Sequence, residues 1–417
     1  MNTNLSNGVA QIEVGNQRFF NNGFIKTAMA IGLIATIGLS TVNNYGLSWD
    51  EPLYIKNVLW NYELIARKKP LPTQPDNIQY YGVVLDVAAE TLYQLKNGID
   101  SRIEINGDRV AFKHVITFLF SLLAYVSVAG NVGIFCGSEY PWLGAITLAL
   151  FPGFWGHSFF NPKDLPFAVL FTLSTWMGAY LVEGYSKLNE KVKIGFNRFS
   201  ITSILFGFLV GLLTIARIGG FVFLGFIPFT YIVTRVGTGK INRDTYKNIF
   251  IGWILIFISW AIVTTVCHPV SWSNPVGWFL ETVKYHSKHG WSGTVLFDGK
   301  FILGSQLPWY YLPRIVTITV PEIFLLLFII GLGLSVYKYS QFSNLQKACL
   351  ILVLLQIFSL SIYAVVKGST LYDGMRQFLF ILPGIAAISA TSIAWLWKKY
   401  KGKFIRFFGL VLMIILC

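Results

Sequence analysis

The sequence predicts an all-α, polytopic membrane protein of about 11 transmembrane helices, with surface helices in its first outer loop. Hydrophobic residues make up 54% of the 417 residues and charged residues 12%, a composition typical of integral membrane proteins. A soluble domain of this length would not bury so much apolar surface. The thirteen Trp and twenty Tyr fit the same class, because their amphipathic rings gather where hydrocarbon meets water.

Long apolar runs define the predicted spans, since a helix needs about 20 mostly apolar residues to cross the hydrocarbon. The first run follows a polar tail, 1–23, and lacks an A-x-A-like cleavage site, so we interpret it as a span and not as a signal peptide. We expect one transmembrane domain, 24–417, with no soluble domain appended. The eleven predicted spans are 24–44, 111–135, 141–157, 165–184, 201–216, 219–234, 248–267, 320–337, 348–366, 378–397 and 404–417.

The apolar run 201–234 is too long for one span. We divide it at Arg217, Gly219 and Gly220, which supply a charge and a turn. With the N-terminus in the cytoplasm, the inner segments then hold 17 basic and five acidic residues, and the outer segments hold 16 and 14. This bias follows the positive-inside rule. It predicts a plasma (inner) membrane protein with its N-terminus in the cytoplasm.

Two outer loops, 45–110 and 268–319, are long, and long loops in compact proteins are more often functional than idle. The first contains EPLYIKNVLWNYELIARK, whose apolar residues recur at helical spacing. This pattern predicts a helix lying along the membrane surface. The formal charge of +14 resides in loops of a membrane protein, so the expected partner is the lipid bilayer and not a nucleic acid. No nucleotide-binding glycine motif is present.

Acidic residues sit at the outer ends of two predicted spans. Asp50 and Glu51 follow the first span, and Asp164 precedes the span that begins at Leu165. Helix capping would also explain them, because Asp is a favoured N-cap residue and proline is common in a first turn. On the predicted topology both acidic sites nevertheless lie on the same membrane face.

Four stretches in order strengthen the functional interpretation: GLSWDEPLY, HSFFNPKDLPF, LPWYYLP at 307–313 and YDGMRQFLFILPG at 372–384. Together they resemble the GT-C superfamily of membrane glycosyltransferases. Within it they are most similar to the glycosyltransferase family 39-like branch of protein O-mannosyltransferases and lipid A aminoarabinose transferases. The resemblance covers most of the chain from about residue 24.

This resemblance implies a GT-C-like fold and a hexosyl- or pentosyltransferase of the cell envelope. The implied donor is a sugar on a polyprenyl phosphate, transferred outside the cytoplasm to a hydroxyl acceptor. Pro52 after the acidic pair departs from the mannosyltransferase pattern, and no soluble sugar-binding insert is present. The acceptor therefore stays open between a protein, lipid A of lipopolysaccharide, another glycolipid and a polymer.

The acidic residues take catalytic roles in the implied reaction. Asp50 matches the first acidic position of the family and is the expected base, because a hydroxyl that attacks an anomeric carbon must lose its proton. Asp164 matches the second position and is expected to orient the acceptor or the nearby cations. Glu51 completes the acidic pair.

Three cations are candidates for binding the donor phosphate: Lys163, Arg217 and Arg376. The departing phosphate gains negative charge, which fixed cations stabilise, and the planar guanidinium can bind two oxygens. Structural alternatives are a partner for Asp164 in the case of Lys163, a hairpin tip for Arg217 and an interfacial anchor for Arg376.

Aromatic pairs in the outer loops are candidates for substrate binding. Tyr80 and Tyr81, and Tyr310 and Tyr311 with the neighbouring Trp309, are expected to stack on sugar rings or to hold the lipid. An interfacial aromatic belt is the alternative.

His286 and His289 lie three residues apart and would share a helix face. They suit a phosphate or a metal ion, and His286 is the candidate that we place in the substrate site. Because no further ligands occur at suitable spacing, we expect neither a metal ion nor another cofactor.

Two other functions remain possible from the sequence. An O-antigen ligase or polymerase would share the substrate class but differ in fold and motifs. A lipid-linked sugar flippase or transporter would require ionisable residues near the membrane midplane and often two related halves. The charged residues here gather at one interface and no repeat is evident, so the sequence favours the transferase.

Overall fold

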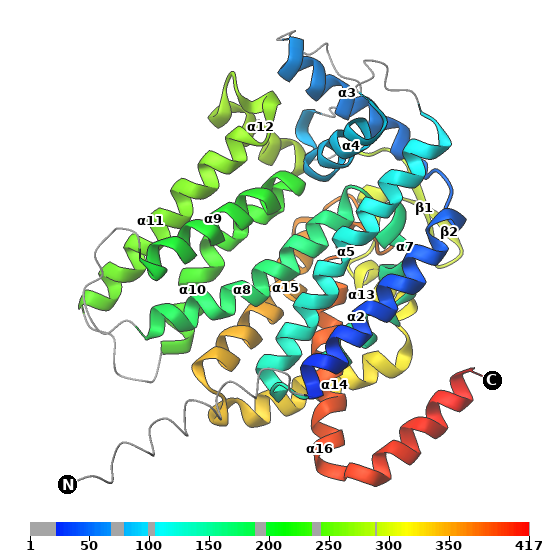
Figure 1. Cartoon of the computed structure of the whole chain (residues 1–417), viewed down its shortest axis with the longest axis vertical. Helices are drawn as coiled ribbons and strands as arrows, with labels where there is room; N and C mark the ends of the chain where they lie inside the picture. The colour runs from blue at the N-terminus through cyan, green and yellow to red at the C-terminus, as the bar shows by residue number, and fades with distance from the viewer. Residues whose placement is uncertain are drawn as a thin grey trace, which may run out of the picture.

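The computed structural model describes residues 22–67, 79–98, 105–187, 197–235, 243–287 and 290–416. Most of the predicted tail 1–23, parts of both long outer loops and His289 lie outside these residues. Long helices run roughly along one direction and form a bundle, and shorter elements gather at one end of it (Figure 1). The predicted all-α class is confirmed, with one small β-hairpin added.

The elements follow one another along the chain with short connections. The α-helices are α2 Asn22–Thr41, α3 Glu51–Arg67, α4 Val84–Asn97, α5 Gly107–Cys136, α6 Pro141–Ala149, α7 Pro152–Phe160, α8 Asp164–Ser186, α9 Arg198–Ala216, α10 Phe223–Arg235, α11 Arg243–Val266, α12 Pro275–Ser287, α13 Tyr311–Thr319, α14 Glu322–Lys338, α15 Asn344–Lys367 and α16 Ile381–Leu416. The 3₁₀ turns are η2 Val42–Asn44, η4 Ile218–Val222, η5 Pro269–Ser271, η6 Gly304–Gln306, η7 Tyr339–Gln341 and η8 Arg376–Phe378, and the strands are β1 Thr294–Phe297 and β2 Lys300–Leu303.

Nine helical segments of the described chain are long and apolar enough to cross a membrane. The pair α6 and α7, bent by 77°, makes a tenth if it counts as one span. The bend falls at Pro152, which begins α7, because proline lacks the N–H that would continue α6. These ten segments match the first ten predicted spans. The eleventh, 404–417, falls in the last part of α16, so the count of eleven stays a prediction.

The predicted break at Arg217 is confirmed. Helix α9 ends at Ala216, the backbone of Arg217 is extended (φ −152°, ψ 137°), and η4 leads into α10. A Cβ added to Gly220 would lie 2.6 Å from the backbone of Leu213. The glycine therefore permits the close turn that separates the two spans.

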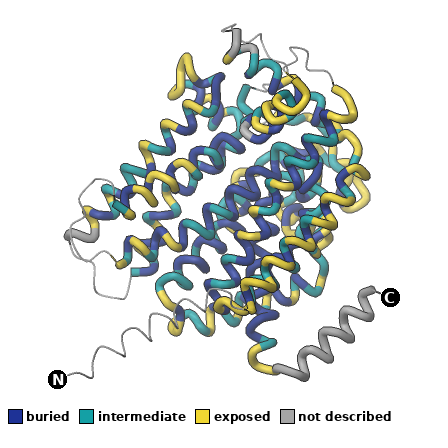
Figure 2. The backbone as a smooth tube through the Cα atoms, viewed as in Figure 1, coloured by how far each residue is buried: buried dark blue, intermediate teal, exposed yellow. Residues whose placement is uncertain are grey.

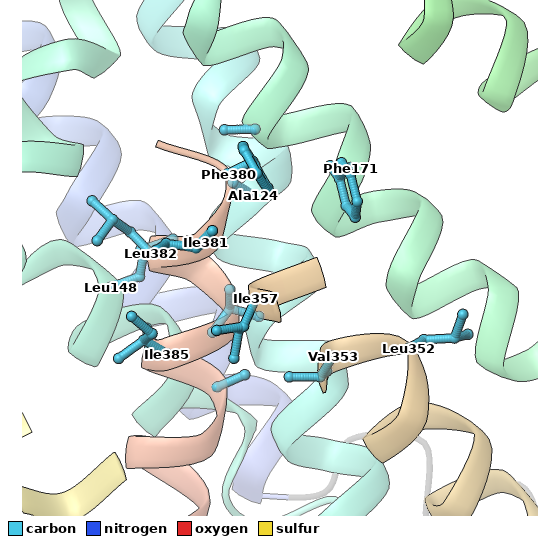
Figure 3. Packing of buried hydrophobic residues seen from close by; sticks show 14 of the residues in the cluster. Ala124, Leu148, Phe171, Leu352, Val353, Ile357, Phe380, Ile381, Leu382 and Ile385 are labelled. Atoms are coloured by element: carbon cyan, nitrogen blue, oxygen red, sulfur yellow. The ribbon is translucent and has the colours of Figure 1, made fainter. Parts of the chain in front are cut away.

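Helices α8 and α16 are the most buried of the spans, whereas α2, α11 and α14 lie at the outside of the bundle (Figure 2). Helix α8 packs against α5, α9 and α15, and α16 packs against α5, α6 and α14. Phe171, Ile357 and Leu382 come from three of these helices and meet in the interior (Figure 3). Such close packing resists deformation, so it fixes the positions of the helix ends.

Shorter helices from the two long loops gather at the end of the bundle where α5 and α8 begin and α9 ends (Figure 1). The predicted helix of the first loop is present as α3. The hairpin of the second loop was not predicted, although Asp298 and Gly299 carry a recognisable signal. Both have positive φ, 49° and 75°, as a two-residue Asp-Gly hairpin turn requires.

Candidate active site

Arg376 joins the two predicted catalytic acids. It lies in η8, just before α16, and its Nη2 pairs with Oδ2 of Asp50, which precedes α3. Its Nε donates to Oδ2 of Asp164, the first residue of α8, at 2.8 Å. These partners lie 326 and 212 positions from Arg376 along the chain. Asp50, Asp164 and a cation thus meet at one end of the bundle.

Asp164 is the buried member of the site, with 2% of its side chain exposed. Arg217 pairs with its second oxygen, Oδ1. Asn161 fixes it further, because Oδ1 of Asn161 accepts the N–H of Asp164 at 2.8 Å and Nδ2 donates to Oδ2 of Asp164 at 3.3 Å. The Asp164 carboxylate therefore does not cap its helix. It holds two guanidinium groups in place, an arrangement that keeps a buried charge paired.

Asp50 is the accessible acid, with 32% of its side chain exposed. On the outer side of Arg376, the carboxylate of Asp373 is 51% exposed and accepts from Nη1 at 3.1 Å. Burial alone would lower the pKa of Arg376, but the carboxylates of Asp164 and Asp50 raise it above its usual value. The guanidinium therefore stays charged, and Asp50 is the acid that a substrate hydroxyl can reach.

A cavity of about 380 Å³ adjoins this cluster. Lys163 and Arg217 line it together with Tyr81, Tyr372 and His286. The other lining side chains are mainly apolar and come from α8, η4, α10, α15 and the segment before α16; they include Phe167, Ile218, Leu360, Tyr363, Ala364 and Phe380. Cations combined with apolar walls suit an anionic group attached to an apolar chain.

The ammonium group of Lys163 lies among aromatic rings. Its Nζ is 3.7 Å from the centroid of the Tyr81 ring and 5.9 Å from that of Tyr54, both within cation–π range. Burial and the neighbouring charge of Arg217 lower the pKa of Lys163 to about 7. Unlike the two arginines, Lys163 makes its close contacts with rings, so its charge is available to a ligand.

Gly82 explains why Tyr81 reaches the cavity. A Cβ at this position would lie 1.8 Å from the carbonyl oxygen of Ile215, two residues before Arg217. The segment after Tyr81 therefore packs directly against the end of α9.

Gly82→Ala is expected to push the Tyr81 segment away from α9 and to lower activity at least about tenfold, because an ångström-scale misplacement near a site is costly. The measurement is transfer activity at matched amounts of folded protein. Gly98→Ala is no suitable control because Gly98 has positive φ, whereas Gly46 has open space around it. Equal activities of Gly82→Ala and Gly46→Ala would refute this role.

The two long loops meet beside the cavity. Tyr80 stacks on Tyr285 of α12 with centroids 4.9 Å apart, and the edge of Tyr81 contacts His286 at 5.3 Å. The carbonyl of Gln79 accepts a hydrogen bond from the indole N–H of the first turn of α12, at Trp278, at 3.1 Å.

Among the predicted substrate-binding residues, Tyr81 and His286 line the cavity and Tyr80 lies behind them. Tyr310 and Tyr311 lie outside the cavity lining and instead pack on Phe297 of the hairpin, at 5.8 and 5.1 Å. Contact of any of these five with a substrate stays a prediction.

Glu51 has a different environment from Asp50. It is buried, and its carboxylate contacts Nε2 of His114 at 2.8 Å and accepts the N–H of Ser48 at 2.5 Å. These contacts hold the turn that presents Asp50. Sequence reasoning missed His114, because nothing along the chain connects this residue of α5 to Glu51. It also missed Asn161, although an amide three residues before Asp164 was a visible signal.

Among the described side chains, no three His, Cys, Asp or Glu groups converge as a metal site. Asp50 and Asp164 bind guanidinium groups instead. The expectation of metal-independent chemistry stays a prediction.

The bundle is similar to solved oligosaccharyltransferase structures from Archaeoglobus fulgidus. The archaeal oligosaccharyltransferase AglB in complex with an inhibitory peptide and a dolichol-phosphate matches with a TM-score of 0.59 and 12% identity, over 89% of this chain and 50% of that one. The apo form of that enzyme matches with a TM-score of 0.59 and 12% identity, over 92% and 51%. The form tethered to an acceptor peptide containing the NVT sequon matches with a TM-score of 0.58 and 14% identity, over 92% and 50%.

This likeness shows the fold, which is GT-C-like as predicted. The chain spans about half the length of these structures. A scan of protein-family models and a search of curated proteins found no match. The finer resemblance, to the mannosyltransferase and aminoarabinose transferase branch, stays a prediction.

Proposed function

We propose that this chain is an integral membrane glycosyltransferase that moves a sugar from a polyprenyl-phosphate donor to a hydroxyl acceptor on the extracytoplasmic face. One observation carries the proposal: two acids and two arginines from four distant segments converge beside a cavity with cationic and apolar lining. The GT-C-like fold supports it, because a similar structure holds a dolichol-phosphate.

In the proposed reaction, the acceptor oxygen attacks the anomeric carbon while the bond from that carbon to the phosphate oxygen breaks. Asp50 takes the hydroxyl proton. The polyprenyl phosphate leaves with an additional negative charge, which Lys163 and Arg217 stabilise from the cavity. Attack opposite the leaving group inverts the anomeric configuration. Asp164 acts through the arginines that it holds.

The charge of the site suits a donor with a single phosphate. With Lys163 protonated, the three cations and the acids Asp50 and Asp164 leave one net positive charge. A sugar linked through a phosphodiester carries one negative charge, whereas a diphosphate carries more. The apolar side chains from α8, α10 and α15 would hold the first isoprene units.

The distribution of buried charge favours this proposal over a transporter. The buried acids, lysines and arginines of the described chain belong to α3, α4 and the first turns of α5 and α8; they are Glu51, Asp86, Glu90, Arg109, Lys113 and Asp164. All lie at one end of the bundle. A transport path would instead place such groups near the middle of the spans.

Mass spectrometry of surface glycans and glycolipids tests the function. A strain lacking the protein should lose one sugar substituent, the wild-type chain should restore it, and Asp50→Asn at equal membrane abundance should not. Loss of a whole polymer from its anchor would instead indicate the ligase or polymerase alternative. An unchanged glycan profile with accumulation of a lipid-linked sugar on one side of the membrane would indicate transport.

Donor binding is expected to depend on pH through Lys163. Its pKa lies at about 7 in the folded protein, so the ammonium loses its proton, and with it the attraction for phosphate, as pH rises through 7. The apparent donor KM should therefore increase between pH 6 and 9.

Lys163→Arg is the matched control for this pH dependence, because guanidinium stays charged throughout the range. Its donor KM should be nearly flat with pH. The same pH profile in both proteins would exclude Lys163 as the titrating group.

A further inference from the structure

The β-hairpin and α13 expose a group of large apolar side chains that the proposed reaction does not use. We call Leu296, Phe301, Trp309 and Ile318 the hairpin patch; these side chains are between 63% and 76% exposed. Leu296 and Phe301 are cross-strand partners, so they stand on the same face of the hairpin. The other face is packed, because Phe297 is buried against Tyr311.

Two tethers fix the level of the patch relative to the spans. At the base of β2, the carbonyl of Gly304 accepts the N–H of Leu371 at 3.0 Å, in the connection from α15 to α16. Helix α13 ends at Thr319, and α14 begins at Glu322. The hairpin is therefore held beside the ends of three spans, and a four-residue strand extends only about 13 Å from its base.

The side chains around the patch are those that favour a membrane interface. Trp309 and the half-exposed Tyr310 combine an apolar ring with a polar atom, as residues at bilayer boundaries do. Lys300 and Arg314 are exposed nearby in β2 and α13, where their long stems can lie on apolar surface while the charges reach headgroups. An apolar cross-strand pair facing water would instead be unfavourable.

We propose that the hairpin patch is seated in the lipid interface of the leaflet at this end of the bundle, with Leu296 and Phe301 in contact with acyl chains. This anchor also bears on the cavity. Trp291, just before β1, stacks on Tyr372 of the cavity lining with centroids 4.6 Å apart. The bilayer thus holds one wall of the donor cavity at a fixed depth.

Site-specific fluorescence quenching tests this placement. Leu296→Cys and Phe301→Cys are prepared separately in a full-length chain carrying Cys267→Ser and Cys417→Ser, labelled with bimane and reconstituted in phosphatidylcholine–phosphatidylglycerol nanodiscs. Quenching is measured with lipids that carry a nitroxide at acyl carbon 5 and, separately, with aqueous iodide. Val366→Cys, on the exposed side of α15, is the lipid reference, and Asn97→Cys, on the exposed side of α4, is the aqueous reference.

Both hairpin labels should be quenched by nitroxide lipid to within about twofold of the label at 366, and by iodide several-fold less than the label at 97. Iodide quenching equal to that at 97 would overturn the proposal by placing the patch in water. Protection from both quenchers would also overturn it, because a protein surface would then cover the patch. Either result leaves the transferase proposal to its own assays.

Discussion

Asp50→Asn is expected to lower the turnover number by about 10²- to 10⁴-fold, the range that a positioned general base contributes. The amide cannot accept the hydroxyl proton as a carboxylate does. It still offers an oxygen to Arg376, so the protein should remain folded and inserted. The measurement is the rate of sugar transfer by purified protein in nanodiscs, with the donor saturating and folding checked by thermal unfolding.

Asp373→Asn provides the matched control. Asp373 also accepts a hydrogen bond from Arg376 but is half-exposed and lies on the far side of the guanidinium from Asp164. Its neutralisation should change turnover less than about threefold. Equal losses in both variants would mean that Asp50 acts only by pairing with Arg376, and wild-type turnover in Asp50→Asn would remove it from the chemistry.

Arg376→Ala is expected to lower both turnover and stability. It separates Asp50 from Asp164 and leaves the buried Asp164 with Arg217 as its remaining guanidinium partner. Removing one partner of a buried charge pair costs about 2 to 5 kcal/mol. We expect the lower end of this range, because Arg376 is partly exposed and Asp164 keeps one partner. Thermal unfolding in nanodiscs and steady-state kinetics measure the two effects.

The kinetic pattern distinguishes the two arginines. Arg376 bridges the acids and does not line the cavity, so its loss should act mainly on kcat. Arg217 lines the cavity, so Arg217→Ala should raise the donor KM as well. Arg376→Lys keeps the charge but loses the planar fork, and should recover stability more than turnover. A rise in donor KM alone on loss of Arg376 would place it in the phosphate site, as the sequence prediction had it.

Much of the fold was predictable because the membrane imposes a simple rule on sequence. Each span must be a long apolar helix, and the charge of Arg217 with the glycines after it was enough to locate a break within a continuous run. Apolar length does not identify the last part of α16 in the same way. The hairpin was missed because its alternation is short, although Asp298 and Gly299 are typical turn residues.

The candidate site was only partly predictable. Asp50, Asp164 and the three cations carry charges at span ends, and such charges are conspicuous in an apolar chain. Their pairing depends on how helices pack, which the local sequence does not contain. His114 lies inside a predicted span and meets Glu51 only through packing.

Tyr310 and Tyr311 illustrate the opposite limit. Their aromatic character fits sugar stacking, interfacial anchoring and core packing equally well. Only the structure places them against Phe297 and away from the cavity lining.

A structure of the protein in nanodiscs with bound polyprenyl monophosphate would test the central claim most directly. The account predicts the phosphate within hydrogen-bonding distance of Lys163 and Arg217, with the first isoprene units along Leu360 and Tyr363 and open space between the phosphate and Asp50. A phosphate bound elsewhere, or separated from Asp50 by packed side chains, would contradict it.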